Sequence, residues 1–318
     1  MNTFPFKGDM NNSSIQYMFE EWITTPELEA LVHSFGGTLQ KKGTLVERVN
    51  KLIRFSDIWD FKSRQNMADI ENVRWTNGKQ LSSEQQKIIL AAARKLGFIG
   101  CRMPSQKSYD YILVLGDEEK SCLLQMKYAK EICDKYGISD SNMVGLTGMK
   151  KIIKSGQTTQ DTYASNAKTE FDLMETEVRK VFGSLEPKER KAYISKNSNK
   201  SWVREYYYNN IPIILLVTLS EEPEEHRSNM EDTFTFFMKQ LEVGCGINVL
   251  LVTSSVLVPY QQLKAIEMLG IPYNDSVETV GFPNEWLDSL DETQKPENYL
   301  QEIRTVLQVI GRLLDDLK

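Results

Sequence analysis

Two long apolar runs constrain the fold of this chain more than any other feature. Residues 211–218 read Ile-Pro-Ile-Ile-Leu-Leu-Val-Thr, and residues 248–253 read Asn-Val-Leu-Leu-Val-Thr. Continuous runs of this kind, rich in β-branched side chains, are typical of strands that are covered on both faces in a parallel sheet. The residues between the two runs leave room for a polar loop and a helix, so a strand–helix–strand unit is expected. The chain is therefore predicted to contain an α/β domain.

The composition argues against several classes of protein. With 318 residues, 41% apolar and 26% charged, the chain is expected to form one large globular domain or two modest ones. The net charge of −6 argues against a nucleic-acid partner or an anionic membrane surface. No segment has the pattern of a signal peptide or a membrane-spanning helix, so a cytoplasmic location is expected. The four cysteines form no Cys-x-x-Cys pair and His33 and His226 are the two histidines, so no metal site is predicted.

The chain divides into two predicted parts. Residues 1–105 form an N-terminal helical segment. Three places in it have the pattern of a helix start: Thr25 before Pro26, Thr44 with Glu47, and Ser82 with the residues up to Gln85. The first 14 residues are polar and are expected to be frayed. This segment is either an independent subdomain or packing for the edge of the sheet. Residues 106–318 form a Rossmann-like domain with a mostly parallel sheet and helices on both faces.

Further elements of the α/β part follow from the periodicity of apolar residues. Strands are predicted at residues 109–116, 142–148 and 277–281, and helices at residues 120–136, 167–182, 260–269 and 297–317. An insertion at about residues 150–210 is longer than a crossover connection requires, so it is predicted to form a lid over the site. The apolar stripe of the C-terminal helix favours either a core position or a homodimer contact.

Polar residues at the strand ends are the candidate site, because ligands of open α/β sheets bind beyond the carboxyl ends of the strands. The candidate catalytic residues are Asp232 and His226, the latter because it is the one histidine near the predicted site. The candidate ligand-binding residues share a position at a strand end or at the helix start that follows it: Gly116, Asp117, Gly148, Lys150, Glu222, Arg227, Asn229, Asp232, Thr233, Ser254, Ser255 and Tyr260.

The charge at the first strand end narrows the kind of ligand. Residues 117–119 read Asp-Glu-Glu, so three carboxylates stand where a helix start could otherwise hold a phosphate. Such an acidic end suits a ribose hydroxyl, an amine or a divalent cation better. The alternative is that the carboxylates simply stabilise the helix dipole. The glutamates at 175 and 177 have a similar simple explanation as a solvated helix face.

Each remaining motif also has an explanation without function. Asn229 is a good N-cap residue for the helix that carries Phe234 and Phe237, and Ser254 and Ser255 can end a strand and cap the helix after it. A histidine in a loop, such as His226, is commonly solvated. The chain has no Gly-x-Ser-x-Gly nucleophile elbow, no Walker loop and no dinucleotide glycine motif after its first strand.

The order of these strand ends resembles the SanA/ElyC/YdcF-like family, which has a Rossmann-like domain of largely unknown chemistry. The resemblance covers residues 109–282 and is carried by four segments: Val114 to Asp117, Leu146 to Met149, Arg227 to Thr233, and Val252 to Ser255. Asp117 and Met230 depart from the family pattern, and Tyr260-Gln261-Gln262 replaces a segment that bears His and Arg in the family.

The resemblance implies a pocket for a small anionic or nucleotide-like ligand, with S-adenosylmethionine suggested for one branch. The predicted function is binding of a nucleotide-like, S-adenosylmethionine-like or phosphate-bearing ligand, with group transfer or hydrolysis as the reaction class. The alternative is an interaction or sensor module that keeps the fold without the chemistry. The departures at Asp117, Met230 and Tyr260 motivate this alternative.

Overall fold

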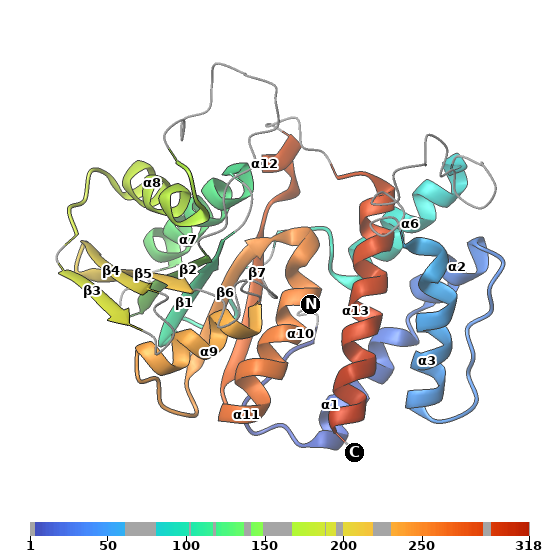
Figure 1. Cartoon of the computed structure of the whole chain (residues 1–318). Helices are drawn as coiled ribbons and strands as arrows, with labels where there is room; N and C mark the ends of the chain where they lie inside the picture. The colour runs from blue at the N-terminus through green and yellow to red at the C-terminus, as the bar shows by residue number, and fades with distance from the viewer. Residues whose placement is uncertain are drawn as a thin grey trace.

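A central sheet with helices on both faces lies beside a group of N-terminal helices (Figure 1). The computed structural model describes residues 4–60, 81–101, 103–116, 119–136, 141–148, 167–187, 189–194, 200–218, 230–288 and 294–317. Within these residues, no helix is both long enough and apolar enough to span a bilayer. The α/β class and the N-terminal helical segment are confirmed.

The sheet is built from seven described strands. They are β1 (Tyr111–Leu115), β2 (Asn142–Gly148), β3 (Glu189–Ile194), β4 (Lys200–Tyr208), β5 (Ile211–Thr218), β6 (Asn248–Ser254) and β7 (Ser276–Phe282). The helices are α1 (Asn12–Ile23), α2 (Pro26–Ser34), α3 (Leu45–Phe55), η1 (Ser56–Trp59), α6 (Ser83–Leu96), α7 (Glu119–Tyr136), α8 (Glu170–Phe182), α9 (Met230–Gln240), η2 (Ser255–Leu257), α10 (Val258–Ala265), η3 (Ile266–Gly270), α11 (Ile271–Tyr273), α12 (Asn284–Asp288) and α13 (Pro296–Asp316).

The strand order is β3-β4-β5-β2-β1-β6-β7. The five strands from β5 to β7 are parallel, and the hairpin β3–β4 adds two antiparallel strands at the β5 edge. The two long apolar runs are β5 and β6, and their side chains are buried on both faces as predicted. The polar composition of residues 188–201 did not predict β3, which is an outer strand with a neighbour on one side alone.

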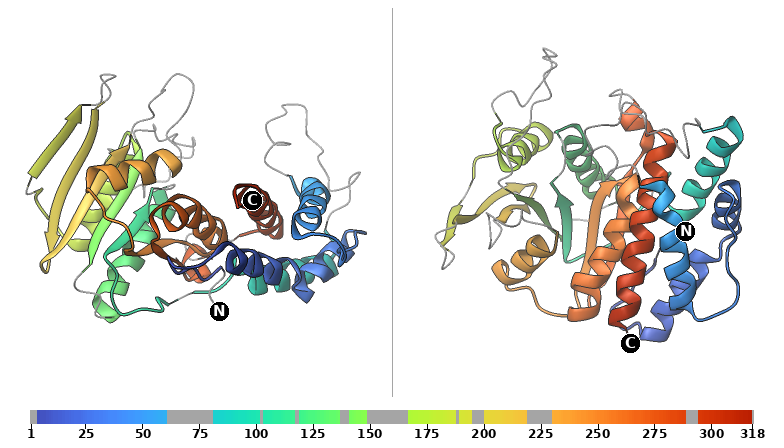
Figure 2. Two further views of the ribbon diagram at one scale, coloured as in Figure 1. Left: turned by 90° about the horizontal axis from the view of Figure 1, so that it is seen from below. Right: turned by 45° about the vertical axis from the view of Figure 1, so that its right-hand side comes forward.

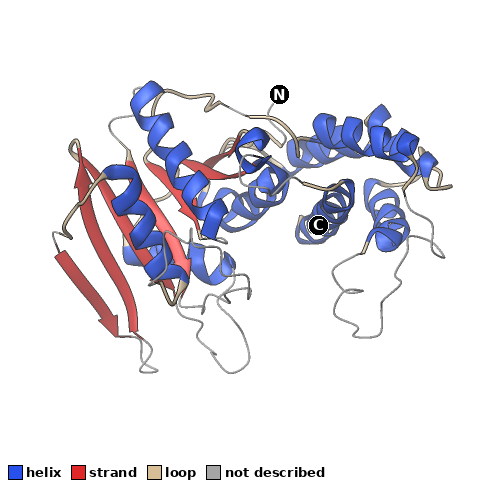
Figure 3. Ribbon diagram, turned by 90° about the horizontal axis from the view of Figure 1, so that it is seen from above, coloured by secondary structure: helices blue, strands red, loops and turns tan. Residues whose placement is uncertain are grey.

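Each face of the parallel strands has its own helices and its own core (Figure 3). Helices α7 and α8 cover one face, which we call the α7/α8 face, and α9 and α10 cover the other, which we call the α9/α10 face. Alternate side chains of one strand enter the two cores, as the pleat requires. In β6, Leu250 and Val252 belong to the core under α7 and α8, whereas Val249 and Leu251 belong to the opposite core.

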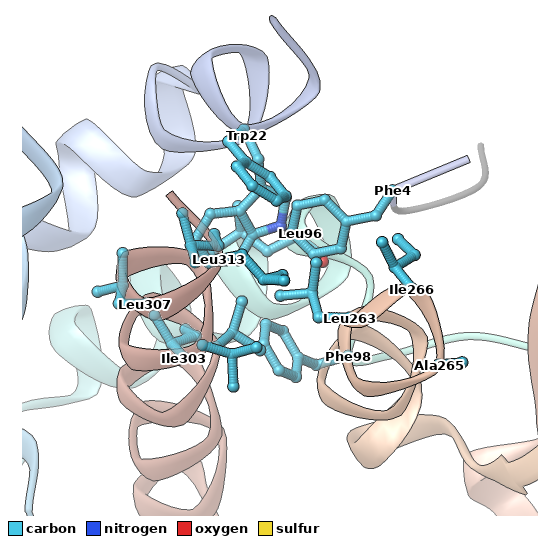
Figure 4. Packing of buried hydrophobic residues seen from close by; sticks show 14 of the residues in the cluster. Phe4, Trp22, Leu96, Phe98, Leu263, Ala265, Ile266, Ile303, Leu307 and Leu313 are labelled. Atoms are coloured by element: carbon cyan, nitrogen blue, oxygen red, sulfur yellow. The ribbon is translucent and has the colours of Figure 1, made fainter. Parts of the chain in front are cut away.

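The N-terminal helices and the C-terminal helix share one core with the α9/α10 face. Helix α13 contacts α10 on one side and α3 and α6 on the other (Figure 2). Figure 4 shows Trp22 of α1, Leu263 of α10 and Leu307 of α13 in this single cluster. The apolar stripe of α13 therefore has a core role, and the N-terminal helices pack against the α/β part through it.

Residues 4–8 are packed rather than frayed, so the prediction of a frayed start is wrong for this segment, and residues 1–3 lie outside the described residues. Phe4 is 2% exposed and Phe6 is 5% exposed. Phe6 forms an antiparallel bridge with Val277 of the edge strand β7. The Gln262 side-chain amide donates hydrogen bonds to the Phe4 carbonyl (3.0 Å) and to the Val277 carbonyl (2.9 Å). We call residues 4–8 the N-terminal arm. The polar composition of the first 14 residues did not indicate this arm, because two buried aromatic side chains are enough to hold so short a segment.

The described part of the predicted lid belongs to the α/β layers. Helix α8 packs on β2 and β5, where a Cβ atom at Gly145 would lie 2.5 Å from Met174 Sδ. The hairpin β3–β4 lengthens the sheet beside β5. Residues 149–166 of the insertion lie outside the described residues. Most of the described insertion is thus a crossover helix and an extension of the sheet.

Local helix signals were largely accurate. Thr44 with Glu47 and Ser82 with Gln85 both form capping boxes, in which side chain and backbone exchange hydrogen bonds. Thr25 precedes α2 as predicted, but its hydroxyl donates to the Trp22 carbonyl (3.1 Å) instead of capping the helix.

Candidate functional site

The direction of the strand connections reverses between β1 and β6, and we call the region beyond the carboxyl ends of these two strands the crevice, because open α/β sheets bind ligands at such a reversal. The chain leaves β1 for α7 on one face and leaves β6 for α10 on the other. Connections that diverge to opposite faces leave room beyond the carboxyl ends of the two strands, which is where open α/β sheets bind ligands. Figure 1 shows this edge at the top of the sheet, with α7 and α10 running away from it. The sequence-based expectation of a site at these strand ends therefore has a specific place in the fold.

Three residues at this edge lie on the α7/α8 face. The core residues Ile112 and Val114 in β1, Met143 in β2 and Leu250 and Val252 in β6 all point to this face. Counting in steps of two along each strand then puts Gly116, Thr147 and Ser254 on the same face. Since β1 lies between β2 and β6, the glycine stands between the two hydroxyl-bearing residues.

Gly116 brings its backbone close to Thr147 and Leu146 of the neighbouring strand. Its N–H donates a 2.7 Å hydrogen bond to the Leu146 carbonyl, which continues the pairing of β1 with β2. A Cβ atom at this position would lie 3.3 Å from Thr147 Oγ1 and from the Leu146 carbonyl oxygen. The φ angle of Gly116 is outside the left-handed region. The position therefore does not need glycine for its backbone angles, and what glycine contributes is the absence of a side chain.

The two hydroxyls are nearly buried and poorly satisfied. Thr147 and Ser254 are each 3% exposed. Thr147 Oγ1 lies 3.4 Å from the carbonyl oxygen of the next residue, a long contact for a hydroxyl. The Ser254 side chain makes no hydrogen bond within the described part of the chain. Neither oxygen is among the fully buried side-chain atoms that lack a partner in the described residues, so Ser254 Oγ, which makes no hydrogen bond there, keeps contact with the surface at the strand ends.

Ser255 has a different role from its neighbour. Its hydroxyl lies 2.5 Å from the Phe282 carbonyl and 3.0 Å from the Gly100 carbonyl, and it can donate to these acceptors. A Cβ atom at Gly281 would lie 2.5 Å from Ser255 Cα, so the backbones of η2 and β7 are in close contact. Ser255 thus holds β6, β7 and the segment after α6 together, and its hydroxyl is engaged within the protein.

Other predicted site residues lie on the opposite face. Val144 and Leu146 belong to the core of the α9/α10 face. Gly148 is two residues further along the same strand, so it lies on that face as well. Asp232 and Thr233 lie in the first turn of α9, which packs against β2 and β5 on that face. Tyr260 lies on α10 and packs against the same core. The sheet therefore separates these four residues from Gly116 and Ser254.

The remaining candidates, which are Asp117, Lys150, Glu222, His226, Arg227 and Asn229, lie outside the described residues. Among the residues that are described, no three His, Cys, Asp or Glu side chains gather in a way that could hold a metal ion. The described surface also has two open grooves, each of about 430–440 Å³, along α1 and along α7. Neither groove is lined by a strand-end residue.

An aromatic group next to the crevice was missed from the sequence. Phe282 at the end of β7 stacks on Trp286 of α12, with ring centroids 6.1 Å apart and an interplanar angle of 13°. Trp286 also packs edge-on against Tyr128 of α7 at 5.9 Å. Tyr128 Oη lies 3.2 Å from Cys101 Sγ. No sequence motif indicates this group, because its members come from three separate parts of the chain, at residues 101, 128 and 282–286.

One acidic residue of α8 is buried and another is half-buried, although the sequence predicted a solvated helix face. Glu177 is fully buried, and Glu175 is in contact with Arg204 and Tyr206 of β4. Burial raises the pKa of Glu175, but the hydrogen bonds from Tyr206 and Arg204 outweigh it and hold that pKa below its usual value. The sequence could not show this, because the partners belong to the unpredicted hairpin.

Comparisons with known proteins relate the chain to mycobacterial proteins. A family model described as the Rv3785 N-terminal domain matches residues 7–97, which end at the residue after α6. The chain is 28% identical over 335 residues to "Uncharacterized protein Rv3785" of Mycobacterium tuberculosis (strain ATCC 25618 / H37Rv). It has the same identity to "Uncharacterized protein Mb3814" of Mycobacterium bovis, and both alignments cover 98% of this chain and 92% of the relative. No solved structure matches the chain.

These findings overturn the resemblance to the SanA/ElyC/YdcF-like family. That resemblance was wrong because it rested on short strand ends rich in Gly, Ser and Thr. Any parallel sheet favours such residues where a strand turns into a helix, so they carry little information on ancestry. The mycobacterial similarity instead includes the N-terminal helices, which the strand-end motifs left out. Over nearly its whole length, the chain is similar to the Rv3785 proteins of mycobacteria.

Proposed function

We propose that this chain binds a small nucleotide-like ligand in the crevice between β1 and β6, on the α7/α8 face of the sheet. The observation that carries the proposal is the pair of nearly buried hydroxyls, Thr147 and Ser254, on either side of Gly116. The Thr147 hydroxyl makes one long hydrogen bond of 3.4 Å and the Ser254 hydroxyl makes none within the described residues, so both can still donate to and accept from a ligand at the strand ends. S-adenosylmethionine-like and phosphate-bearing molecules of similar size belong to the same proposal.

The position of the hydroxyls supports binding more directly than it supports catalysis. Among the described residues, neither hydroxyl is hydrogen-bonded to a histidine or carboxylate that would activate it as a nucleophile. Group transfer or hydrolysis would need an acid–base group in addition. We therefore propose a binding site at these strand ends. The class of any reaction depends on which ligand binds there.

Thermal unfolding with a panel of compounds tests the proposal. The panel holds nucleosides, nucleotides, S-adenosylmethionine, sugar phosphates and divalent cations. A ligand at 100 times its dissociation constant stabilises the folded chain by about 2.7 kcal/mol, which raises the midpoint measurably. A panel in which no compound raises the midpoint would contradict the proposal.

A pair of glycine variants locates the site. Gly116→Ala places a methyl group 3.3 Å from Thr147 Oγ1, at the strand end between β2 and β6, and should abolish the ligand-induced shift. Gly244→Ala is the matched control, because no atom lies within 4 Å of a Cβ atom there. A shift that survives in Gly116→Ala would place the ligand elsewhere.

A further inference from the structure

The groove along α1 lies apart from the strand ends and has a lining of its own. Its volume is about 440 Å³, and its apolar lining comes from Pro5 of the N-terminal arm, from Met10, and from Tyr17 and Met18 of α1. Met18 is 8% exposed and belongs to the floor of the groove, whereas Tyr17 is 63% exposed, so its ring is accessible to a ligand. A space of this size is in the range of small-ligand sites, about 300–1,000 Å³.

One charged residue, Glu21, lines this groove in the described part of the chain. The Tyr17 hydroxyl donates a 2.9 Å hydrogen bond to Glu21 Oε1, so the aromatic ring and the carboxylate lie side by side on one face of α1. The neighbouring Glu20 is paired with Arg48, but no cationic side chain forms an ion pair with Glu21 within the described residues. The groove therefore carries a negative charge that the protein does not neutralise.

We propose that this groove binds a small organic cation, an amine whose charged nitrogen carries methyl or other small alkyl groups. A positive charge over the face of the Tyr17 ring is attracted by the electrons of the ring, and the carboxylate of Glu21 adds a direct Coulomb attraction. The alkyl groups would pack against Met10 and Met18, because the flexible thioether of methionine adapts to the shape of a ligand. This site is independent of the proposed function at the strand ends.

The small extent of exposed apolar surface favours a small ligand over a protein partner. The other large apolar side chains with high exposure in the described residues are Met103, Tyr207 and Ile271, and none of them lines the groove. A stable protein interface buries about 800 Å² on each partner. An aromatic side chain contributes about 150–250 Å² of this area, so Tyr17 with the edges of two methionines supplies too little.

Titration of the full chain with choline, followed by nuclear magnetic resonance, tests the proposal. The neutral control is 3,3-dimethylbutan-1-ol, which has the shape of choline without its charge. Choline should shift the amide signals of Tyr17 and Glu21 until they saturate, and it should bind at least about fivefold more tightly than the alcohol. N-acetylarginine amide represents the side chain of a protein partner. It should bind more weakly than choline, because its charged group has no methyl groups to pack against the methionines.

Variants of the groove connect this preference to its two central residues. Glu21→Gln should remove the advantage of choline over the alcohol, and Tyr17→Leu should weaken the binding of choline. Tyr17→Phe keeps the ring and should keep the preference. Glu84→Gln is the matched control, because Glu84 is an exposed glutamate of α6 that does not line the groove, and its loss changes the net charge by the same amount. Circular dichroism verifies that each variant is folded.

Each contrary result counts against the site in a different way. If choline shifts no signal, or binds no more tightly than the alcohol, the groove does not recognise an organic cation. Tighter binding of N-acetylarginine amide than of choline would overturn the proposal in favour of a protein partner. A preference for choline that persists in both Glu21→Gln and Tyr17→Leu would overturn it by placing the cation elsewhere.

Discussion

The Tyr109 hydroxyl donates a 2.6 Å hydrogen bond to Glu278 Oε2, although 169 residues separate the two in sequence. Glu278 also accepts a 2.9 Å hydrogen bond from the Ser105 N–H and a 2.6 Å hydrogen bond from the Ser105 hydroxyl. Burial, followed by the bond to Glu278, raises the pKa of Tyr109 well above its usual value. These contacts attach the connection between the N-terminal helices and β1 to the edge strand β7.

Replacement of Tyr109 by Phe should destabilise the fold. The variant removes one donor from a buried carboxylate, which costs about 1–3 kcal/mol. Urea unfolding of the two proteins measures the difference. Tyr111→Phe is the matched control, because the Tyr111 side chain packs on Phe237 and makes no hydrogen bond in the described part of the chain. Equal losses in both variants would contradict the role assigned to the Tyr109 hydroxyl.

Asp275 should make the stability of the chain depend on pH. The side chain is fully buried, and Oδ2 has no hydrogen-bond partner among the described residues. Burial raises its pKa from 3.8 to about 6, and the nearby Asp110 adds to the rise. Because the folded-state pKa is raised, the protonated folded state is favoured. The stability that the protonated Asp275 contributes is complete below about pH 4 and is lost as the pH rises through about 6.

Asp275→Asn tests this pH dependence. The variant keeps an acceptor for the Ile247 N–H, which donates to Asp275 Oδ1 at 3.1 Å, and removes the titrating group. It should exceed the original protein in stability by roughly 2 kcal/mol at pH 8 and lose that advantage near pH 4. Thermal unfolding across this pH range is the measurement. A constant difference between the two proteins from pH 4 to pH 8 would show that Asp275 does not titrate as expected.

Phe6→Ala should weaken the attachment of the N-terminal arm. The side chain is 5% exposed and lies against Gly270, where a Cβ atom would come within 2.5 Å of Phe6 Cε1. Removal of a buried phenyl ring costs about 3 kcal/mol. Lys7→Ala, at the adjacent exposed position, should change the free energy of unfolding by less than about 0.5 kcal/mol. Similar values for the two variants would mean that the arm adds nothing to stability.

Arg204→Ala should reveal the contribution of the contact between α8 and β4. Arg204 pairs with Glu175 and also lies over the Phe171 ring, 4.8 Å from its centroid. The variant leaves a largely buried carboxylate, so a loss of about 2 kcal/mol is expected. Since the pKa of Glu175 is lowered from 4.5, this contribution exists above pH 4.5 and fades as the pH falls below it.

A surface ion pair provides the comparison for Arg204. Lys41 lies 2.9 Å from Glu29, and its side chain is 73% exposed. Lys41→Ala should cost less than about 0.5 kcal/mol at any pH, because water screens the pair. The contrast between the two variants in chemical unfolding at pH 7 separates a buried ionic contact from an exposed one. If Arg204→Ala costs no more than Lys41→Ala, the contact does not hold the hairpin.

Local patterns predicted much of the fold and two of the three residues of the candidate site. The apolar runs predicted β5 and β6, and the capping residues Thr44 and Ser82 predicted the starts of α3 and α6. The strand ends predicted Gly116 and Ser254 as site candidates. Thr147 was not chosen, although it stands in the same motif as Gly148. Which of the two adjacent residues faces the crevice depends on the strand register, and the sequence does not show the register.

By itself, the sequence determined the α/β class, the ends of most elements and the polar character of the strand ends. These properties depend on neighbouring residues, through periodicity, capping and turn chemistry. The tertiary structure decided that Gly116, Thr147 and Ser254 share one face, that Ser255 bonds to distant carbonyls, and that Phe6 is buried. Each of these outcomes depends on strand pairing or packing between segments far apart in the chain, and local composition carries no record of such partners.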